Sequence, residues 1–150
     1  MLKVAIEPPR TSDILELLRL GDEYGLSLYP AESYYGLDID DLEKPGVSVF
    51  VARDGTTAAG IVALVDRGDT TAEIKRMFVS EAARGLGVAG LLIAALEQYA
   101  RSTGLTVIQL ETGPKQPAAI SLYEKHGYQH IAQFGQYIGD ASSVCMQKAL

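Results

Sequence analysis

The chain has 150 residues, 47% of them hydrophobic and 21% charged, and a formal net charge of −6. This length suits one domain with a single sizeable core, expected over residues 1–150, and the composition is typical of a globular protein. An acidic chain without a basic run argues against a nucleic-acid partner, because a phosphate backbone attracts positive charge. No apolar run reaches the roughly 20 residues needed to cross a bilayer, so no membrane partner is expected.

Cellular location and metal binding can be addressed from a few residues. The N-terminal segment MLKVAIEPPR lacks the apolar stretch of a signal peptide, and a lone cysteine, Cys145, cannot form an internal disulfide. Both features predict a cytoplasmic protein. The histidines, His126 and His130, have no cysteine or carboxylate cluster at ligand spacing around them, so no metal site is predicted.

The first third of the chain predicts a strand, a helix and an irregular segment. Residues 3–7 form a short β-rich run that ends at two prolines. Helix-capping residues follow at 11–13, and we expect a helix that ends near residues 21–25, where glycines stand. Residues 30–46 predict an irregular segment with short helical turns. The expected buried face of the helix consists of Ile14, Leu17 and Leu18.

Three β-rich runs follow, at residues 47–53, 58–66 and 71–79. The turn signal Asp54-Gly55 separates the first run from the second, and Arg67-Gly68-Asp69 separates the second from the third. These strands are therefore expected to form an antiparallel meander.

The second half of the chain alternates helices and strands. Gly104 ends a long helix, and the continuous apolar run 105–111 is typical of a buried parallel strand. A second helix at 117–127 has proline in its first turn and glycine at its end, and strands are expected at 128–134 and 142–150. The fold class is thus α/β, with a mixed sheet and one βαβ crossover. The expected buried face of the long helix is Val88, Leu91, Leu92, Ala95, Leu96 and Tyr99.

The segment RGLGVAG, residues 84–90, lies between a strand and the long helix. From Gly85 it matches the dinucleotide-binding spacing G-x-G-x-x-G, and Glu111 ends the next strand about 20 residues on, where an acidic ribose ligand would stand. We reject that interpretation because residues 80–84 separate the strand from the glycines and hairpin-linked strands flank the loop. The chain is also too short for a dinucleotide fold with a substrate domain.

The loop still predicts an anion site. Glycines let a backbone approach its ligand closely, and the first turn of a helix offers unpaired N–H groups at the positive end of its dipole. Arg84 adds a charge suited to a pyrophosphate. The alternative is that Gly87 and Gly90 only permit close packing of the helix against the strand.

Two motifs together resemble the GNAT superfamily of N-acetyltransferases, which depend on acetyl-coenzyme A (acetyl-CoA). Residues 84–89 meet the family's loop Q/R-x-x-G-x-G/A, and residues 116–128 are similar to its second motif, N-x-x-A-x-x-L-Y-x-K-x-G-F/Y, with Gln116 in place of the asparagine. The spacing P-x-E-S-x-x-x-L-D at 30–38 and the ending S-V-C-M-x-K at 143–148 are similar to small bacterial members of unassigned substrate. The matching residues of the second motif are Ala119, Leu122, Tyr123, Lys125, Gly127 and Tyr128.

The resemblance implies a GNAT-like central sheet, mostly antiparallel and splayed at its middle strands, with helices on both faces. It also implies acetyl-CoA as cosubstrate. The pantetheine arm would lie along the strand like an extra strand, and one N–H near Phe78 or Val79 would stabilise the oxyanion. The backbone amides of the loop would hold the pyrophosphate. The implied cofactor-binding residues are Met77, Phe78, Val79, Arg84, Gly85, Leu86, Gly87, Val88, Ala89, Gln116 and Tyr123.

The same resemblance implies two catalytic residues. Tyr123 stands where the family places its general acid, and a phenol of pKa about 10 can protonate a thiolate, whose thiol has a pKa of about 8.5. The alternative is that Tyr123 is a core aromatic residue. Glu73 stands where some members carry a catalytic base, on a strand face expected to include Lys75 and Met77. Glu73 could instead pair with Lys75 so that both form a solvated surface patch, and water could relay the proton.

The acceptor is expected between the irregular segment and the connection of the last two strands, which implies substrate binding by Tyr29, Glu32, Ser33, Tyr34 and Tyr137. Tyrosines could wall this pocket and Glu32 or Asp38 could bind a cation, or the tyrosines could only cover the sheet edge. The predicted function is acetyl transfer to the amine of a small molecule through a tetrahedral intermediate. The alternative is a non-catalytic module that senses acyl-CoA. The acceptor, the acyl chain and the oligomeric state, a homodimer included, are left open.

Overall fold

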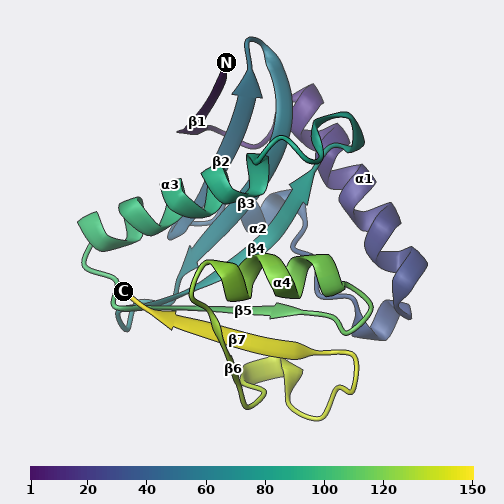
Figure 1. Ribbon diagram of the computed structural model, residues 1–150, viewed down its shortest axis with the longest axis vertical. Helices are drawn as coiled ribbons and strands as arrows, with labels where there is room; N and C mark the ends of the chain where they lie inside the picture. Colours follow the sequence, from purple (N-terminus) through teal and green to yellow (C-terminus); the bar gives the residue numbers. More distant parts are fainter.

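A seven-stranded sheet in the order β1-β2-β3-β4-β5-β7-β6 organises the computed structural model, which describes all 150 residues (Figure 1). Neighbouring strands are antiparallel except β4 and β5, which run parallel. The meander of β2, β3 and β4 and the single βαβ crossover are therefore confirmed. The strands are β1 (Leu2–Ile6), β2 (Val47–Asp54), β3 (Thr57–Asp66), β4 (Thr71–Val79), β5 (Val107–Thr112), β6 (Gln129–Ile131) and β7 (Val144–Ala149).

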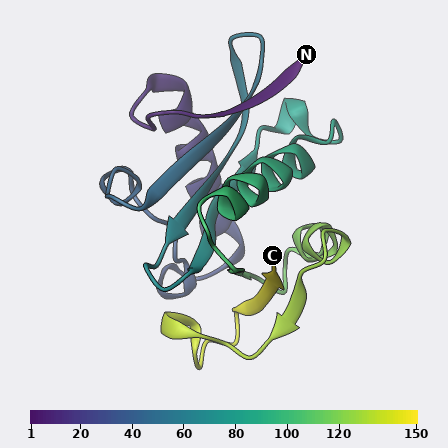
Figure 2. The same cartoon turned by 90° about the vertical axis from the view of Figure 1, so that its left-hand side faces the viewer.

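Helices cover both faces of the sheet, as expected. On one face, α1 (Ser12–Leu28) and α2 (Ile39–Leu42) enclose a small core, and on the other α3 (Val88–Ser102) and α4 (Pro117–Lys125) enclose a larger one. Figure 2 shows α1 on one side of the strands and α3 and α4 on the other. None of the helices has both the length and the apolar character needed to span a membrane. Short 3-10 helices complete the chain: η1 (Ala31–Ser33), η2 (Glu81–Ala83) and η3 (Gly135–Tyr137).

The expected splay of the middle strands is present between β4 and β5. These strands pair only from Thr71–Val107 to Ile74–Leu110, although both continue beyond that point. A β-bulge in β4 lies just past this point. Ala63 pairs with Lys75 and Ile61 pairs with Phe78, so two steps along β3 correspond to three steps along β4. The bulge contains Arg76, whose φ of +59° lies in the left-handed region.

The bulge overturns one expectation about side-chain direction. Strand alternation predicted that Glu73, Lys75 and Met77 share a face. Met77 instead packs against the core under α3, the same core that contains Ile74. The inserted residue reverses the alternation, so only Glu73 and Lys75 remain together on their face.

Helix α1 is longer than the sequence predicted, since it runs through Gly21 and Gly25 to Leu28. Neither glycine ends the helix. A Cβ atom at Gly25 would overlap the ring of Tyr34, so the absence of a side chain there lets this ring rest on the helix. A Cβ atom at Gly21 would make only an ordinary contact, 3.5 Å from the ring of Phe78.

Two further expectations were wrong in detail. Leu91 is 43% exposed, because the buried stripe of α3 passes through Leu92 and Ile93 instead. Strand β6, Gln129–Ile131, is also shorter than the strand expected at residues 128–134. Tyr128 before it packs in the core, and the chain turns into η3 at Gly135, where φ is +54°.

Candidate active site

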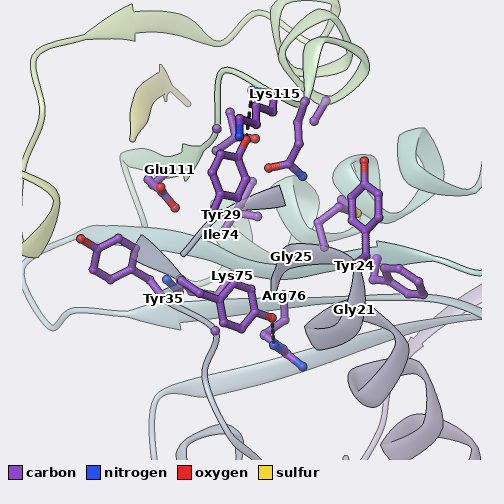
Figure 3. Close-up of a pocket in the computed structure, with 18 of the residues that line it drawn as sticks. Gly21, Tyr24, Gly25, Tyr29, Tyr35, Ile74, Lys75, Arg76, Glu111 and Lys115 are labelled. Carbon is purple, nitrogen blue, oxygen red and sulfur yellow. Dashed lines mark hydrogen bonds between the residues drawn. The ribbon is translucent and has the colours of Figure 1, made fainter. Parts of the chain in front are cut away.

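A cavity of about 500 Å³ lies between α1, the diverging part of β4 and β5, and the start of α4 (Figure 3). It exists because the sheet is open there, past the last β4–β5 pair, and Gly21 and Gly25 of α1 form part of its lining. Tyr24 and Gly21 stand at one end of Figure 3, and Tyr35, Lys75 and Glu111 at the other. We call the end with Tyr24 and Gly21 the Arg84 end, because Arg84, next to the glycine loop, lies over the ring of Tyr24. The opposite end is the Glu111 end.

The Arg84 end can hold an anion. Gly85 and Gly87 have φ values of +81° and +79°, and the backbone amides of residues 85–90 donate no backbone hydrogen bond. The first amide to bond within α3 is that of Leu91, which donates to the carbonyl of Gly87 at 3.1 Å. A run of free N–H groups at a helix start, beside a guanidinium, suits a phosphate-bearing group.

Of the predicted loop residues, only Arg84 lines the cavity. Gly85, Leu86, Gly87 and Ala89 lie beyond its lining, so a ligand would meet them at the rim. Val88 is a core residue whose side chain packs close to Gly60. Its amide is therefore the part available to a ligand.

The remaining predicted cofactor residues lie along the cavity. Met77, Phe78 and Val79 line it from β4, and Gln116 and Tyr123 line it from α4. The β4 edge that faces β5 is unpaired past Ile74, so its backbone groups are open to an extended ligand. The side chain of Gln116 makes no capping hydrogen bond at the start of α4, which leaves its side-chain amide free.

Tyr123 is both a core residue and part of the cavity lining. Its side chain is only 5% exposed and its ring packs edge-on against Tyr128, at 5.7 Å between centroids. Its hydroxyl nevertheless borders the cavity. Every fully buried side-chain N or O atom of the protein has a hydrogen-bond partner, and because this hydroxyl has none, it must be accessible. Burial raises the pKa of Tyr123 above its ordinary value, so the phenol stays protonated.

Glu73, which the resemblance implied as a catalytic base, does not line the cavity. Its carboxylate accepts hydrogen bonds from Arg67 at 2.6 Å and from the hydroxyl of Tyr137 at 2.5 Å. Tyr137 is 1% exposed and also lies outside the cavity lining. Its hydroxyl accepts a hydrogen bond from Lys75 at 2.7 Å. Glu73 therefore belongs to a partly buried polar cluster with Arg67, Lys75 and Tyr137, and the solvated surface patch that the alternative expected for Glu73 and Lys75 is not what the structure has.

Glu111 is the carboxylate that the cavity does contain, and the sequence analysis gave it no catalytic role. It is the first β5 residue past the last pair with β4, and Ser143 donates a hydrogen bond to it at 2.8 Å. Burial raises the pKa of Glu111 to about 7. No motif marks this residue, because its importance depends on where β4 and β5 separate.

The irregular segment after α1 reaches the cavity with some of the expected residues. Tyr29, Ser33 and Tyr34 line it, whereas Glu32 is exposed and lies outside the lining. The hydroxyl of Tyr29 accepts a hydrogen bond from the amide of Lys115 at 3.0 Å. The hydroxyl of Tyr34 donates to Asp22 and accepts from Arg76, and burial raises the pKa of Tyr34 to about 12.

Asp140 ties this segment to the loop before β7. It accepts hydrogen bonds from Ser33 at 3.2 Å and from the hydroxyl of Tyr35 at 2.6 Å. The segment and the loop thus meet at the Glu111 end, where Ser33, Tyr35 and Ser142 line the cavity. Neither Glu32 nor any aspartate lines the cavity, and Glu111 is its single carboxylate.

Charge in the cavity is opposite to that of the chain. Four cationic side chains line it, against one carboxylate, in a protein whose net charge is −6. The cations are Lys75, Arg76, Arg84 and Lys115. The cavity therefore suits anionic groups, and neither Glu32 nor Asp38, the two residues expected to be able to bind a cation, lines it.

Residues 13–128 match the family model of the acetyltransferase (GNAT) family. The chain belongs to the GNAT family. It is 38% identical over 148 residues to IAA acetyltransferase of Azospirillum brasilense, a match that covers 98% of this chain and 97% of that protein. It is also 34% identical over 116 residues to the uncharacterized N-acetyltransferase YedL of Escherichia coli, which covers 76% of this chain and 73% of YedL. The GNAT chain is thus similar to acetyltransferases over nearly its full length.

Solved structures agree with this assignment of family and fold. A Klebsiella pneumoniae protein assigned as an acyl-CoA N-acyltransferase has a TM-score of 0.84 and 30% identity, covering 100% of this chain and 98% of that one. An acetyltransferase of Bacillus subtilis, solved in complex with CoA, has a TM-score of 0.77 and 20% identity, covering 100% and 99%. At that identity the second likeness concerns the fold alone. The GNAT chain is an acyltransferase of this fold.

Proposed function

We propose that this GNAT protein transfers the acetyl group of acetyl-CoA to the amine of a small molecule. The observation that carries the proposal is one continuous cavity, bordered by Tyr123 and by Glu111 and ending beside the free amides of residues 85–90. An anion site, an open strand edge and two proton-transfer groups therefore border the same space. The CoA reported with the Bacillus subtilis structure supports the choice of cosubstrate.

Acetyl-CoA fits the long axis of this cavity. Its pyrophosphate would meet Arg84 and the free amides of the loop, where positive charge and N–H groups converge. Its pantetheine amides would pair with the open edge of β4 along Met77–Val79, past the point where β5 leaves. Gln116 would contact the same arm from α4. The thioester would then lie near Tyr123.

The reaction requires the acceptor amine to lose a proton before it attacks. Glu111 takes this proton in our proposal, because it lines the cavity and its pKa of about 7 matches a base working near neutral pH. The amine nitrogen then bonds to the thioester carbon. The N–H of Phe78 or Val79 stabilises the negative oxygen of the tetrahedral intermediate.

Collapse of that intermediate breaks the carbon–sulfur bond and leaves a thiolate. Tyr123 protonates this thiolate, since its hydroxyl has no partner in the protein and its raised pKa keeps it protonated. The nitrogen loses its extra proton to solvent as the amide forms, and solvent reprotonates Tyr123. Glu73 has a positioning role in this scheme. Through Tyr137 it holds the ammonium group of Lys75 at the Glu111 end.

The proposal is tested by following thiol release from acetyl-CoA over a panel of amines, together with calorimetric titration of CoA. Release that depends on an amine, with an N-acetylated product, is the expected result. Tight CoA binding with no release on any amine would instead assign a non-catalytic sensing module. Binding of NADH without binding of CoA would overturn both.

A further inference from the structure

Lys75 and Glu111 are a pair of opposite charges on either side of the splay. Each follows directly on the last β4–β5 pair, Ile74 with Leu110, and each lines the cavity. Figure 3 shows both at the same end of the cavity, next to Tyr35. The proposed acyl transfer, on which this inference rests, gives Glu111 a partner in the acceptor amine but gives Lys75 none.

The ammonium group of Lys75 has unused donors. It makes one hydrogen bond within the protein, to the hydroxyl of Tyr137 at 2.7 Å, although an ammonium carries three N–H groups. Glu73 is the only carboxylate in ion-pair range, and its distance of 3.9 Å is too long for a hydrogen bond. Arg67 and Tyr137 already bond to Glu73. Lys75 therefore lacks a close anionic partner.

The other cations of the cavity are committed elsewhere. Arg76 donates to Asp22, to the hydroxyl of Tyr34 and to the carbonyl of Leu18. Lys115 donates to the carbonyl of Leu28 at 3.0 Å, and Arg84 stands at the far end of the cavity. Lys75 is thus the cation that an acceptor at the Glu111 end would meet.

The two charges at this end favour an acceptor that carries both signs. Lys75 and Glu111 have opposite charges, and neither makes a hydrogen-bonded ion pair within the protein. A simple ammonium would meet Glu111 but leave the ammonium group of Lys75 unpaired, which is costly at a mostly buried side chain. The two charges of a zwitterion can face the opposite charges of Glu111 and Lys75. Burial lowers the pKa of Lys75, so a bound anion would stabilise its ammonium form.

We propose that the acceptor is an α-amino acid, whose carboxylate pairs with Lys75 while its amine faces Glu111. The rings of Tyr29 and Tyr35 lie at the cavity near this end and offer apolar surface to the amino-acid side chain. Lys75 is then a residue that determines specificity, and the proton transfers remain with Glu111 and Tyr123.

The test compares matched acceptors: each common α-amino acid, its carboxamide and its decarboxylated amine. Thiol release gives kcat and KM, and calorimetric titration of the same compounds into CoA-loaded protein gives binding without turnover. The variants are Lys75→Met, which removes the charge, and Lys75→Arg, which keeps it. Lys3→Met is the matched control, since Lys3 is an exposed lysine on β1.

We expect the free acid of at least one matched set to exceed its carboxamide and its amine roughly tenfold or more in kcat/KM. Lys75→Met should abolish this preference mainly by raising KM, Lys75→Arg should retain it, and Lys3→Met should change nothing. A preference for the amide or amine would overturn the proposal, as would a preference that survives in Lys75→Met.

Titration separates this inference from the proposed function. Free acids that bind the CoA-loaded protein more tightly than their amides, without thiol release, would support the Lys75 site while contradicting acyl transfer. Turnover of amines that lack a carboxylate, with no binding of any amino acid, would support acyl transfer and overturn the Lys75 site.

Discussion

The hydroxyl of Tyr29 lies so close to Gly113 that a Cβ atom at position 113 would overlap it. The same hydroxyl accepts a hydrogen bond from the amide of Lys115, so the chain just past α1 is fastened to the loop between β5 and α4. This contact closes the cavity from one side. A glycine at 113 is required by the close approach of the ring, since its own φ is not in the left-handed region.

The variant Gly113→Ala should therefore displace Tyr29 and open the cavity. We expect the free energy of unfolding to fall by about 1 kcal/mol, the value of a typical hydrogen bond, and KM for acetyl-CoA to rise. Chemical denaturation and steady-state kinetics measure the two effects. Tyr29→Phe is the matched variant, because it removes only the hydroxyl. Wild-type values for Gly113→Ala in both assays would show that the ring has no role in closure.

The acid limb of the pH–rate profile should belong to Glu111. A base with a pKa of about 7 must be ionised to act, so kcat/KM should rise with pH up to about that value and then level. Glu111→Gln should lose this limb and lower kcat by roughly 10²-fold. Glu81→Gln, at an exposed glutamate of η2, is the control. If the acid limb persists in Glu111→Gln, the base is water or another group and not Glu111.

The same residue should make stability depend on pH. The folded-state pKa of Glu111, about 7, is above the ordinary value of 4.5, so its ionisation destabilises the folded protein. The penalty is absent below 4.5, grows as pH rises through that window and is complete above about 7. Glu111→Gln cannot ionise, so its melting temperature should exceed that of the wild type near pH 8 and match it near pH 4. An equal difference at both pH values would contradict the buried carboxylate.

The sequence predicted the elements and the cosubstrate loop because both are local. Glycine spacing, turn residues and helical periodicity are read within a few residues of one another, and the L-Y-x-K motif placed Tyr123 on α4 beside the cavity. Which carboxylate lines the cavity could not be predicted from the sequence, for a nonlocal reason. Whether Glu73 or Glu111 borders it depends on the pair at which β4 and β5 part, and on a bulge that reverses the alternation after Lys75.

Glycines of α1 were misinterpreted for the same reason. Locally, Gly21 and Gly25 read as a helix end, since glycine is a poor helix former. The helix continues because a ring from the following segment occupies the space over Gly25, and such packing can stabilise a helix against its intrinsic preference. Tyr34, which supplies that ring, was identified only as an acceptor residue.

Tyr123→Phe should slow the chemical step while leaving cofactor binding intact. The hydroxyl has no protein partner, so its removal breaks no hydrogen bond in the fold, and the ring can keep its contact with Tyr128. We expect kcat to fall roughly 10²-fold with little change in the Kd of CoA or in melting temperature. Tyr128→Phe, which loses a hydrogen bond to Glu97 in the core, should show the reverse pattern. Unchanged turnover in Tyr123→Phe would remove it from its role as the acid.

Charge at the glycine loop can be isolated with two substitutions at one position. Gly87 has a φ of +79° and open space around its Cα, so a side chain there meets backbone strain and no steric overlap. Asparagine and aspartate tolerate this conformation similarly and have nearly equal size, but only aspartate adds negative charge beside the free amides. We expect Gly87→Asp to raise the Kd of CoA at least tenfold more than Gly87→Asn does, with the gap shrinking as salt is added. Equal Kd values for the two variants would place the phosphates away from the start of α3.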